Sequence, residues 1–172
     1  MMKDDMDREL HHECGVFGII GVENAAQYAY YALHSLQHRG QQSCGIVSAN
    51  IGGVLNLHKG TGLVTEVFNG STLSQLPGTM AIGHVRYPTT NVGGMENIQP
   101  FIFNHHTGNF AIAHNGNIIN SAELRLYLER RGSLFQSSSD SELFGHLIKK
   151  ERSEDHRIYN IMDALNMIEG AF

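Results

Sequence analysis

The residues of this sequence that could do chemistry lie in short polar segments where its apolar runs end. The first is Cys14, which follows a polar leader of residues 1–13 and opens the apolar run CGVFGIIGV. Further along, apolar runs end in LQHRGQQS, GHVRYPTT, AHNGN and SSSDSE. A lone cysteine is by default a small buried hydrophobic residue, and the alternative is a nucleophile at the start of a strand. The polar segments favour the nucleophile.

Hydrolysis of a primary amide would use these groups together. If residues 1–13 are removed, Cys14 gains a free α-amino group, which titrates near neutral pH and can accept the thiol proton. One residue would then supply both the nucleophile and its base. The side chain of Asn115 and the backbone N–H of Gly116 would stabilise the tetrahedral oxyanion. We therefore predict Cys14, Asn115 and Gly116 as catalytic residues.

Recognition of an amino-acid substrate needs two further charges. Arg86 would hold an α-carboxylate as a bidentate clamp, and Asp140 would accept hydrogen bonds from an α-ammonium. Each residue also has a structural interpretation. Asn115–Gly116 is a type I′ turn signal, and Arg86 would also serve as a salt-bridge partner. Asp140 and Arg39 would each suit the oppositely charged end of a helix. From the residues alone, both interpretations stay open.

The elements that must position these residues are short strands followed by helices. Apolar patterns predict strands over 14–22, 44–50, 54–60, 80–87, 101–103 and 110–114, and helices over 24–39, 120–131, 139–150 and about 158–165. Strands joined by hairpins predict an α+β fold. Asn24 and Gln27 resemble a capping box, and Gly40 stands where a left-handed residue would end the first helix. The final EGAF resembles the start of another strand, so we expect a domain truncated at its C-terminal end.

Charge and composition exclude several partner classes. The net charge is −5, and no run of Lys and Arg is long enough to follow a phosphate backbone, so we expect no nucleic acid. No apolar stretch reaches the roughly 20 residues that span a bilayer, and the leader lacks the apolar segment of a signal peptide. We therefore expect a soluble, cytoplasmic protein without a membrane partner. The 11 histidines and two cysteines show no ligand spacing, which predicts no metal site.

Six segments, taken in order, resemble one known family. They are CGVFGI, LHSLQHRGQQSCGIV, GHVRYPTT, ENIQP, HNGNIINSAEL and SSSDSE. The family is that of glutamine phosphoribosylpyrophosphate amidotransferase, also called amidophosphoribosyltransferase, whose N-terminal glutaminase domain is of the class II, N-terminal-nucleophile type. The resemblance implies a four-layer αββα sandwich and glutamine as substrate. It also implies that residues 1–13 are a propeptide and residues 14–172 an incomplete glutaminase domain.

The resemblance assigns a role to each candidate residue. Cys14 is the nucleophile, Asn115 and Gly116 form the oxyanion hole, and Arg86 and Asp140 bind the carboxylate and ammonium of glutamine. Arg39 shapes the site around the nucleophile. Relatives carry a second, phosphoribosyltransferase domain, where ammonia displaces pyrophosphate from phosphoribosylpyrophosphate in the first committed step of purine synthesis. We expect that domain to be absent here, together with its Mg²⁺ and the iron–sulfur cluster of some relatives, and we expect a homo-oligomer at full length.

Two alternatives remain beside this assignment. The same kind of glutaminase domain occurs in glucosamine-6-phosphate synthase and asparagine synthetase, although LHSLQHRGQ and HVRYPT favour the purine enzyme. The chain could also be an inactive fragment, because an uncleaved leader leaves Cys14 without a free α-amino group. Cys44 stands where relatives usually carry a small residue, and we interpret it as a packing substitution.

Overall fold

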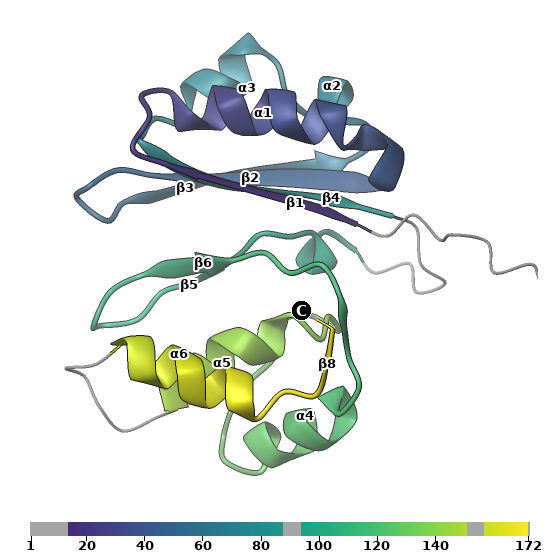
Figure 1. Cartoon of the computed structure of the whole chain (residues 1–172), viewed down its shortest axis with the longest axis vertical. Helices are drawn as coiled ribbons and strands as arrows, with labels where there is room; N and C mark the ends of the chain where they lie inside the picture. The colour runs from purple at the N-terminus through teal and green to yellow at the C-terminus, as the bar shows by residue number, and fades with distance from the viewer. Residues whose placement is uncertain (1–13, 88–93, 151–156, 172) are drawn as a thin grey trace, which may run out of the picture.

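The computed structural model describes residues 14–87, 94–150 and 157–171, which form four layers in the order helix, sheet, sheet, helix (Figure 1). The larger sheet is antiparallel, with the strand order β1–β4–β2–β3. Its strands are β1 (Gly15–Ile20), β2 (Ser43–Ala49), β3 (Leu55–Thr61) and β4 (Met80–Arg86). The α+β class and the αββα layers predicted from the sequence are confirmed.

The register of this sheet brings two candidate site residues to one edge. Gly15 of β1 pairs with Val85 of β4, and Ser43 of β2 pairs with Arg86. Because neighbouring strands of an antiparallel sheet run in opposite directions, β1 begins where β4 ends. Cys14, directly before β1, and Arg86, the last residue of β4, therefore lie at the same end of adjacent strands.

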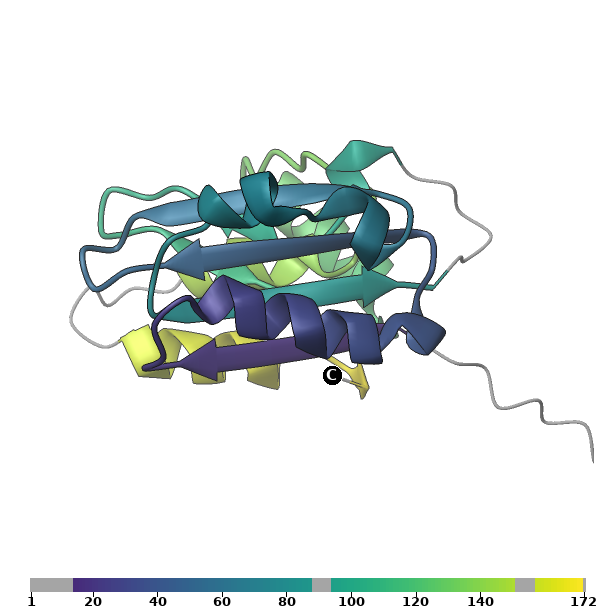
Figure 2. The ribbon, with the colours of Figure 1, turned by 90° about the horizontal axis from the view of Figure 1, so that it is seen from above.

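Helices cover the outer face of this sheet, where α1 (Ala25–Ser35) lies along the strands (Figures 1 and 2). After α1 comes a short 3-10 helix (Gln37–Arg39), and α2 (Val64–Val67) and α3 (Gly70–Ser74) lie beside α1. Small alanines on the inner side of α1 let it approach the sheet closely. The core between them contains Ala25, Ala26, Ala29, Leu33, Cys44, Ile46, Val64, Phe68, Leu76, Ala81 and Val85.

The second half of the chain forms the two remaining layers. A 3-10 helix (Met95–Asn97) leads into the hairpin β5 (Phe101–Phe103) and β6 (Phe110–Ile112), which faces the larger sheet. The pair β7 (Asn117–Ile118) and β8 (Gly170–Ala171) joins segments far apart in the sequence. The outer helices are α4 (Ser121–Glu129), α5 (Glu142–Lys150) and α6 (Arg157–Asn166). Their core contains Ile118, Leu124, Leu128, Leu143, Phe144, Leu147, Ala164 and Ile168.

Two local predictions at the first helix are wrong. Asn24 adopts a left-handed backbone and its side chain makes no capping hydrogen bond. Gln27 N–H donates to the backbone carbonyl of Asn24, and Ala25 N–H donates to the carbonyl of Gly78. Gly40 is extended rather than left-handed. A Cβ at Gly40 would lie 2.7 Å from backbone atoms of Arg86, so glycine is needed there for close packing. Both outcomes depend on chain segments distant in sequence.

Four elements were not predicted at all. They are the short helices α2 and α3, the 3-10 helix Met95–Asn97 and the strand β7, none of which is longer than 5 residues. Segments this short carry too few positions for a hydrophobic period. Within residues 14–87, 94–150 and 157–171, no helix is long and apolar enough to cross a bilayer.

Candidate active site

A polar cavity of about 350 Å³ opens where β1 begins and β4 ends, facing the loops of the second half. Four of the predicted site residues line it, namely Cys14, Arg86, Gly116 and Asp140. The remaining lining residues are His84, Asn97, Gln99, His114, Asn117, Ser121, Ser138, Ser139 and Ser141. Residues from both halves of the chain therefore meet around one space beside the cysteine.

The cysteine is held by the turn that follows α1. Arg39 donates from Nε to the carbonyl oxygen of Cys14 at 3.3 Å. The carbonyl of Arg86 in turn accepts the N–H of Gln42 at 3.1 Å, so the segment after Arg39 is fixed to the end of β4. Arg39 contacts the backbone of Cys14, and it is not among the described residues that line the cavity. Its position fits the predicted role of shaping the site rather than that of contacting substrate.

The predicted oxyanion segment is not a hairpin turn. β6 pairs with β5 and β7 pairs with β8, so Asn115–Gly116 connects two sheets instead of reversing one strand. A Cβ at Gly116 would overlap the carbonyl oxygen of Ala171, because β8 passes directly over this segment. Gly116 lines the cavity, whereas Asn115 does not do so in the described structure. The glycine is therefore required by the passing strand as well as suited to expose its N–H.

Asp140 lies just before α5 and reaches across to the oxyanion segment. Its Oδ2 accepts the backbone N–H of Ile118 at 3.0 Å. The carboxylate is thus tied to β7, two residues after Gly116, and lines the cavity on the side opposite the larger sheet. This contact joins the loop before α5 to the segment that contains Gly116.

The loop before α5 is itself held by a buried carboxylate. Glu142 is only 3% exposed, and it accepts the N–H of Gln136 at 2.7 Å and the N–H and hydroxyl of Ser137 at 2.8 and 2.7 Å. Asn97 accepts the N–H of Ser138 at 3.0 Å. These bonds satisfy backbone donors that a loop cannot pair within itself. They shape the wall that carries Asp140.

His84 is a lining residue that the sequence did not single out. It lies on β4 and is 1% exposed, and neither of its ring nitrogens has a hydrogen-bond partner among the described residues. Burial, together with the nearby charge of Arg86, lowers its pKa to about 4. His84 is therefore neutral at physiological pH.

Gln99, His114 and Ser141 were also missed. All three are buried polar residues that line the cavity and bond to one another. The available signal was their position, since His114 directly precedes Asn115–Gly116 and Ser141 directly follows Asp140. A buried polar side chain next to a candidate site residue is often there to orient it.

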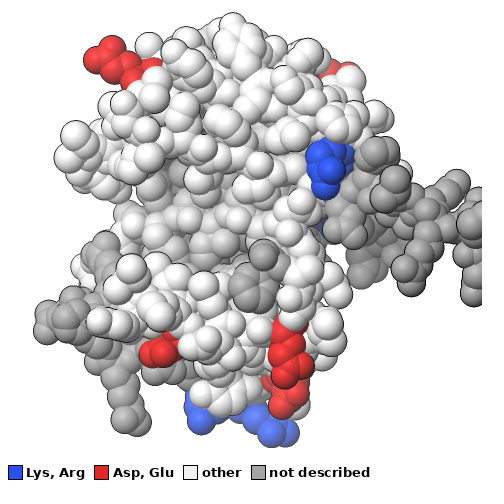
Figure 3. All heavy atoms as spheres, in the orientation of Figure 1, with Lys and Arg blue, Asp and Glu red and all other residues white. Residues whose placement is uncertain are grey.

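Two other features of the sequence have no place in this site. Burial raises the pKa of the Cys44 thiol to about 12, and Cys44 is fully buried in the core under α1, so its thiol is unreactive. Among the residues that the structure describes, no group of three His, Cys, Asp or Glu side chains could hold a metal ion. On the face shown in Figure 3, Lys and Arg do not gather into a continuous stripe.

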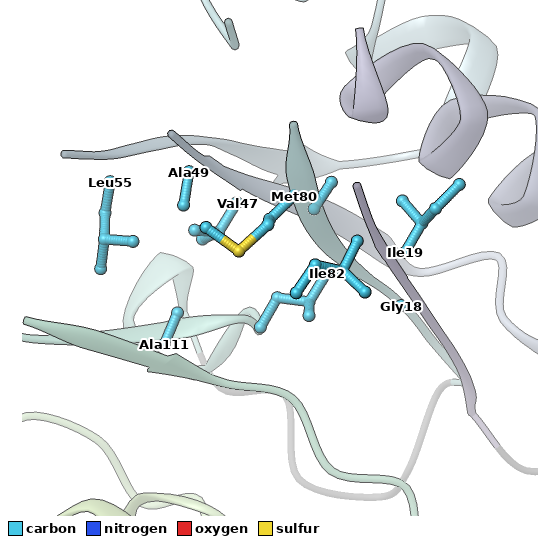
Figure 4. A pocket seen from close by; sticks show the side chains of 10 residues that line it. Gly18, Ile19, Val47, Ala49, Leu55, Met80, Ile82 and Ala111 are labelled. Atoms are coloured by element: carbon cyan, nitrogen blue, oxygen red, sulfur yellow. The ribbon is translucent and has the colours of Figure 1, made fainter. Parts of the chain in front are cut away.

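A second cavity, of about 470 Å³, lies between the larger sheet and the β5–β6 hairpin and is apolar (Figure 4). Its walls carry aliphatic side chains such as Val47, Met80 and Ile82 from the sheet, with Ala111 opposite. Its lining contains no group that could act as nucleophile, acid or base. The polar cavity beside Cys14 is therefore the better candidate for chemistry of the two.

A four-layer sandwich with a cysteine directly before its first strand, opening on a polar cavity, defines the fold class of the N-terminal-nucleophile hydrolases. Residues 84–172 match the family described as the glutamine amidotransferase domain, which covers half of the sequence. The chain belongs to that family.

Solved structures and curated proteins agree with this assignment. The chain is similar to glutamine phosphoribosylpyrophosphate amidotransferase from B. subtilis complexed with ADP and GMP, with a TM-score of 0.83 and 49% identity over 90% of this chain and 33% of that one. A structure described as the allosteric regulatory enzyme of purine biosynthesis gives a TM-score of 0.86 and 50% identity over 91% of this chain and 33% of that one.

Among curated proteins, the chain is 52% identical to the amidophosphoribosyltransferase of Bacillus subtilis, over 95% of this chain and 34% of the relative. It is 47% identical to amidophosphoribosyltransferase 3, chloroplastic, of Arabidopsis thaliana, over 98% of this chain and 31% of the relative. The chain thus spans about a third of the length of the curated relatives it matches.

Proposed function

We propose that this chain is the glutamine-hydrolysing part of an amidophosphoribosyltransferase, with Cys14 as its nucleophile. The observation that carries the proposal is the single cavity in which Cys14, Arg86, Gly116 and Asp140 meet, although they come from four separate segments. A thiol, a cation, an anion and an exposed backbone donor are the groups that hydrolysis of an amino-acid amide requires.

The reaction begins when residues 1–13 have been removed and Cys14 carries a free α-amino group. This amine takes the thiol proton, and the thiolate attacks the carbon of the γ-carboxamide. Gly116 N–H and the side chain of Asn115 stabilise the oxyanion of the tetrahedral intermediate. As the C–N bond breaks, the amine returns its proton to the leaving nitrogen, which departs as ammonia. Water then hydrolyses the thioester to glutamate.

Arg86 and Asp140 select the substrate. Arg86 pairs with the α-carboxylate and Asp140 with the α-ammonium. The backbone of Arg86 and the carboxylate of Asp140 are already held by hydrogen bonds in the absence of substrate, which reduces the entropic cost of binding. Arg39 keeps the backbone of Cys14 in place during the reaction.

For the whole protein, we propose that the ammonia is transferred to phosphoribosylpyrophosphate to give 5-phosphoribosylamine, in the first committed step of purine synthesis. The relatives named amidophosphoribosyltransferase support this use of ammonia. We assign the phosphoribosyl substrate and Mg²⁺ to the phosphoribosyltransferase domain of such a protein. Cys14 and Cys44 cannot supply the four thiolates of an iron–sulfur cluster, so any cluster would need ligands outside residues 14–172. We further propose a cytoplasmic homo-oligomer.

The decisive experiment measures ammonia release from glutamine by a chain whose N-terminus is established by mass spectrometry. We expect release from chains that begin at Cys14 and none from chains that keep the leader. Cys14→Ala should abolish release and also block leader removal, whereas the matched control Cys44→Ala should retain both. Full activity of Cys14→Ala, or no activity from chains verified to begin at Cys14, would contradict the proposal.

A second measurement separates binding from chemistry. Arg86→Ala should raise KM for glutamine at least about tenfold, because a charge-assisted bidentate pair is worth more than 1.4 kcal/mol. Arg130→Ala, on the surface turn after α4, is the control for loss of a positive charge. An unchanged KM in Arg86→Ala would show that Arg86 is structural.

A further inference from the structure

Three buried side chains connect the predicted oxyanion segment to Asp140, and the direction of each hydrogen bond between them can be deduced. They are Gln99, His114 and Ser141, the last of which is 1% exposed. Buried polar groups need partners, and each donor and acceptor here has a defined neighbour. Two backbone groups, one that only donates and one that only accepts, determine the directions.

The first of these groups is the backbone N–H of His114, which can only donate. It lies 2.7 Å from Oε1 of Gln99, so this end of the amide is the acceptor. The other end, Nε2, is therefore the one that lies 3.1 Å from the hydroxyl oxygen of Ser141. An amide nitrogen can only donate, so Ser141 Oγ accepts from Gln99.

The second group is the carbonyl of Ala171, which can only accept. It lies 3.3 Å from Nε2 of His114, so this contact is a hydrogen bond only if Nε2 carries the proton. In a neutral imidazole, Nδ1 is then an acceptor. Nδ1 lies 2.9 Å from Ser141 Oγ, and the hydroxyl proton of Ser141 therefore points to His114.

Ser141 has only one proton, so it cannot also donate to Asp140. The distance from Ser141 Oγ to Oδ1 of Asp140 is 3.3 Å, whereas a hydroxyl that donates to a carboxylate usually comes within about 2.7 Å. Asp140 Oδ2 is occupied by Ile118 N–H. Oδ1 thus has only this longer contact with the Ser141 hydroxyl, whose proton points to His114, and it belongs to a side chain that lines the cavity.

We propose that His114 holds the hydroxyl proton of Ser141 away from Asp140, which leaves Oδ1 free to accept the α-ammonium of the substrate. This inference rests on the proposed function, since it concerns how the same site recognises glutamine. His114 and Ser141 are positioning residues, because they determine whether the carboxylate that binds the ammonium is available. The carbonyl of Ala171 sets the arrangement by choosing the tautomer of His114.

The test exchanges His114 for two amides that each copy one ring nitrogen. Asparagine places an acceptor near the position of Nδ1, whereas glutamine reaches the position of Nε2 and leaves nothing opposite Ser141. In His114→Gln the hydroxyl is free to donate to Asp140, where it competes with the ligand. The probe is L-glutamate, the product, whose binding to the chain beginning at Cys14 is measured by calorimetry.

We expect His114→Gln to weaken glutamate binding about tenfold, the effect of one hydrogen bond to a charged group. The dissociation constant of His114→Asn for glutamate should stay within about threefold of that of the unmodified chain, a difference of roughly half of that free energy. Thermal unfolding of both variants checks that they fold. Equal affinities in His114→Gln and the unmodified chain would overturn the inference.

A second substitution distinguishes competition from structural damage. Ser141→Ala removes the competing hydroxyl, so the double variant His114→Gln/Ser141→Ala should bind glutamate several-fold more tightly than His114→Gln alone. If His114 and Ser141 only support the fold, the double variant should bind no better than the single one. Such a result would refute the proposed direction of the Ser141 proton.

The tautomer is measured directly by ¹⁵N NMR of the imidazole. We expect the signals of a ring protonated at Nε2 and unprotonated at Nδ1, both before and after glutamate is added. A proton on Nδ1 would overturn the inference. Failure of the proposed function looks different, because the unmodified chain would then neither bind glutamate nor release ammonia from glutamine.

Discussion

The two halves of this molecule hold their sides of the site by different means. In residues 14–87, strands β2, β3 and β4 are each 7 residues long and pair along their whole length, so backbone hydrogen bonds place Cys14 and Arg86. In residues 94–171, the strands are 2 or 3 residues long. There the polar walls are placed by buried side chains that bond to backbone groups, such as Asp140 and Glu142.

This difference predicts two kinds of sensitivity to substitution. The first half depends on apolar packing of α1 on a sheet, so removal of buried volume should cost most there. The second half depends on buried polar groups that are hydrogen-bonded, so removal of one acceptor should leave several buried donors without a partner. His84, on strand β4, is a buried polar side chain whose ring nitrogens have no hydrogen-bond partner among the described residues.

The largest effect is expected from the packed half. Leu33→Ala should lower the free energy of unfolding by about 4 kcal/mol, because Leu33 is fully buried under α1 and its removal leaves a cavity. Urea denaturation measures the change. Tyr31→Ala on the outer side of the same helix, where the side chain is 67% exposed, should change it by less than about 0.5 kcal/mol. Similar losses in both variants would refute the assigned orientation of α1.

The next effect depends on pH. The pKa of His84 is lowered from 6.5 to about 4 in the folded protein, chiefly by burial. Between these pH values the unfolded chain binds one more proton than the folded one, so the free energy of unfolding falls as the pH falls. The expected loss from His84 is about 3 kcal/mol, complete near pH 4 and absent above pH 7.

The contribution of His84 is isolated by comparison with His84→Met, which keeps a large side chain that does not titrate. Urea denaturation measures the free energy of unfolding of both proteins between pH 4 and pH 7. The difference between them cancels the pH dependence that comes from other titrating groups. The unmodified chain should lose more stability than His84→Met over this range. Parallel pH profiles would show that His84 does not stay neutral in the folded protein.

A somewhat smaller effect is expected in the second half. Glu142→Gln should lower the free energy of unfolding by about 2 kcal/mol, because it replaces the carboxylate that accepts three hydrogen bonds from Gln136 and Ser137. Glu129→Gln is the matched control, since Glu129 is exposed and pairs only with Arg125 on the surface of α4. If Glu142→Gln lowers the free energy of unfolding no more than Glu129→Gln does, the second half does not depend on buried polar contacts as proposed.

The last prediction concerns the chemical reactivity of the two cysteines, of which Cys44 should not react in the folded chain. Iodoacetamide should alkylate Cys14 in the folded chain and leave Cys44 unmodified, because burial raises the pKa of Cys44 to about 12 and closes off its sulfur. In denaturant both cysteines should react. Mass spectrometry of peptides counts the labels, and rapid labelling of Cys44 without denaturant would show that the packed half opens easily.

Much of the fold was predictable because its longer elements carry a local period. The apolar spacing of residues 24–39 predicted α1, and the alternation around residues 44–60 predicted the β2–β3 hairpin. The mistakes at Asn24 and Gly40 have the opposite cause. Their conformations are set by Gly78 and Arg86, more than 40 residues away in the sequence, and no local pattern reports such a contact.

The sequence by itself identified four of the residues that line the site. Cys14, Arg86, Gly116 and Asp140 were selected by residue type and by their place at the ends of apolar runs, and all four line one cavity. Residue type also predicted Asn115 and Arg39, but the sequence could not show that Arg39 bonds to the backbone of Cys14.

Only the tertiary structure decided how those groups are held and which way their protons point. Ala171 and His114 are brought together by the pairing of β7 with β8, and from that contact follow the tautomer of His114, the direction of the Ser141 hydroxyl and the free oxygen of Asp140. Hydrogen bonds depend on distances of a few tenths of an ångström. A sequence specifies which groups can donate or accept, and the folded chain decides which of them meet.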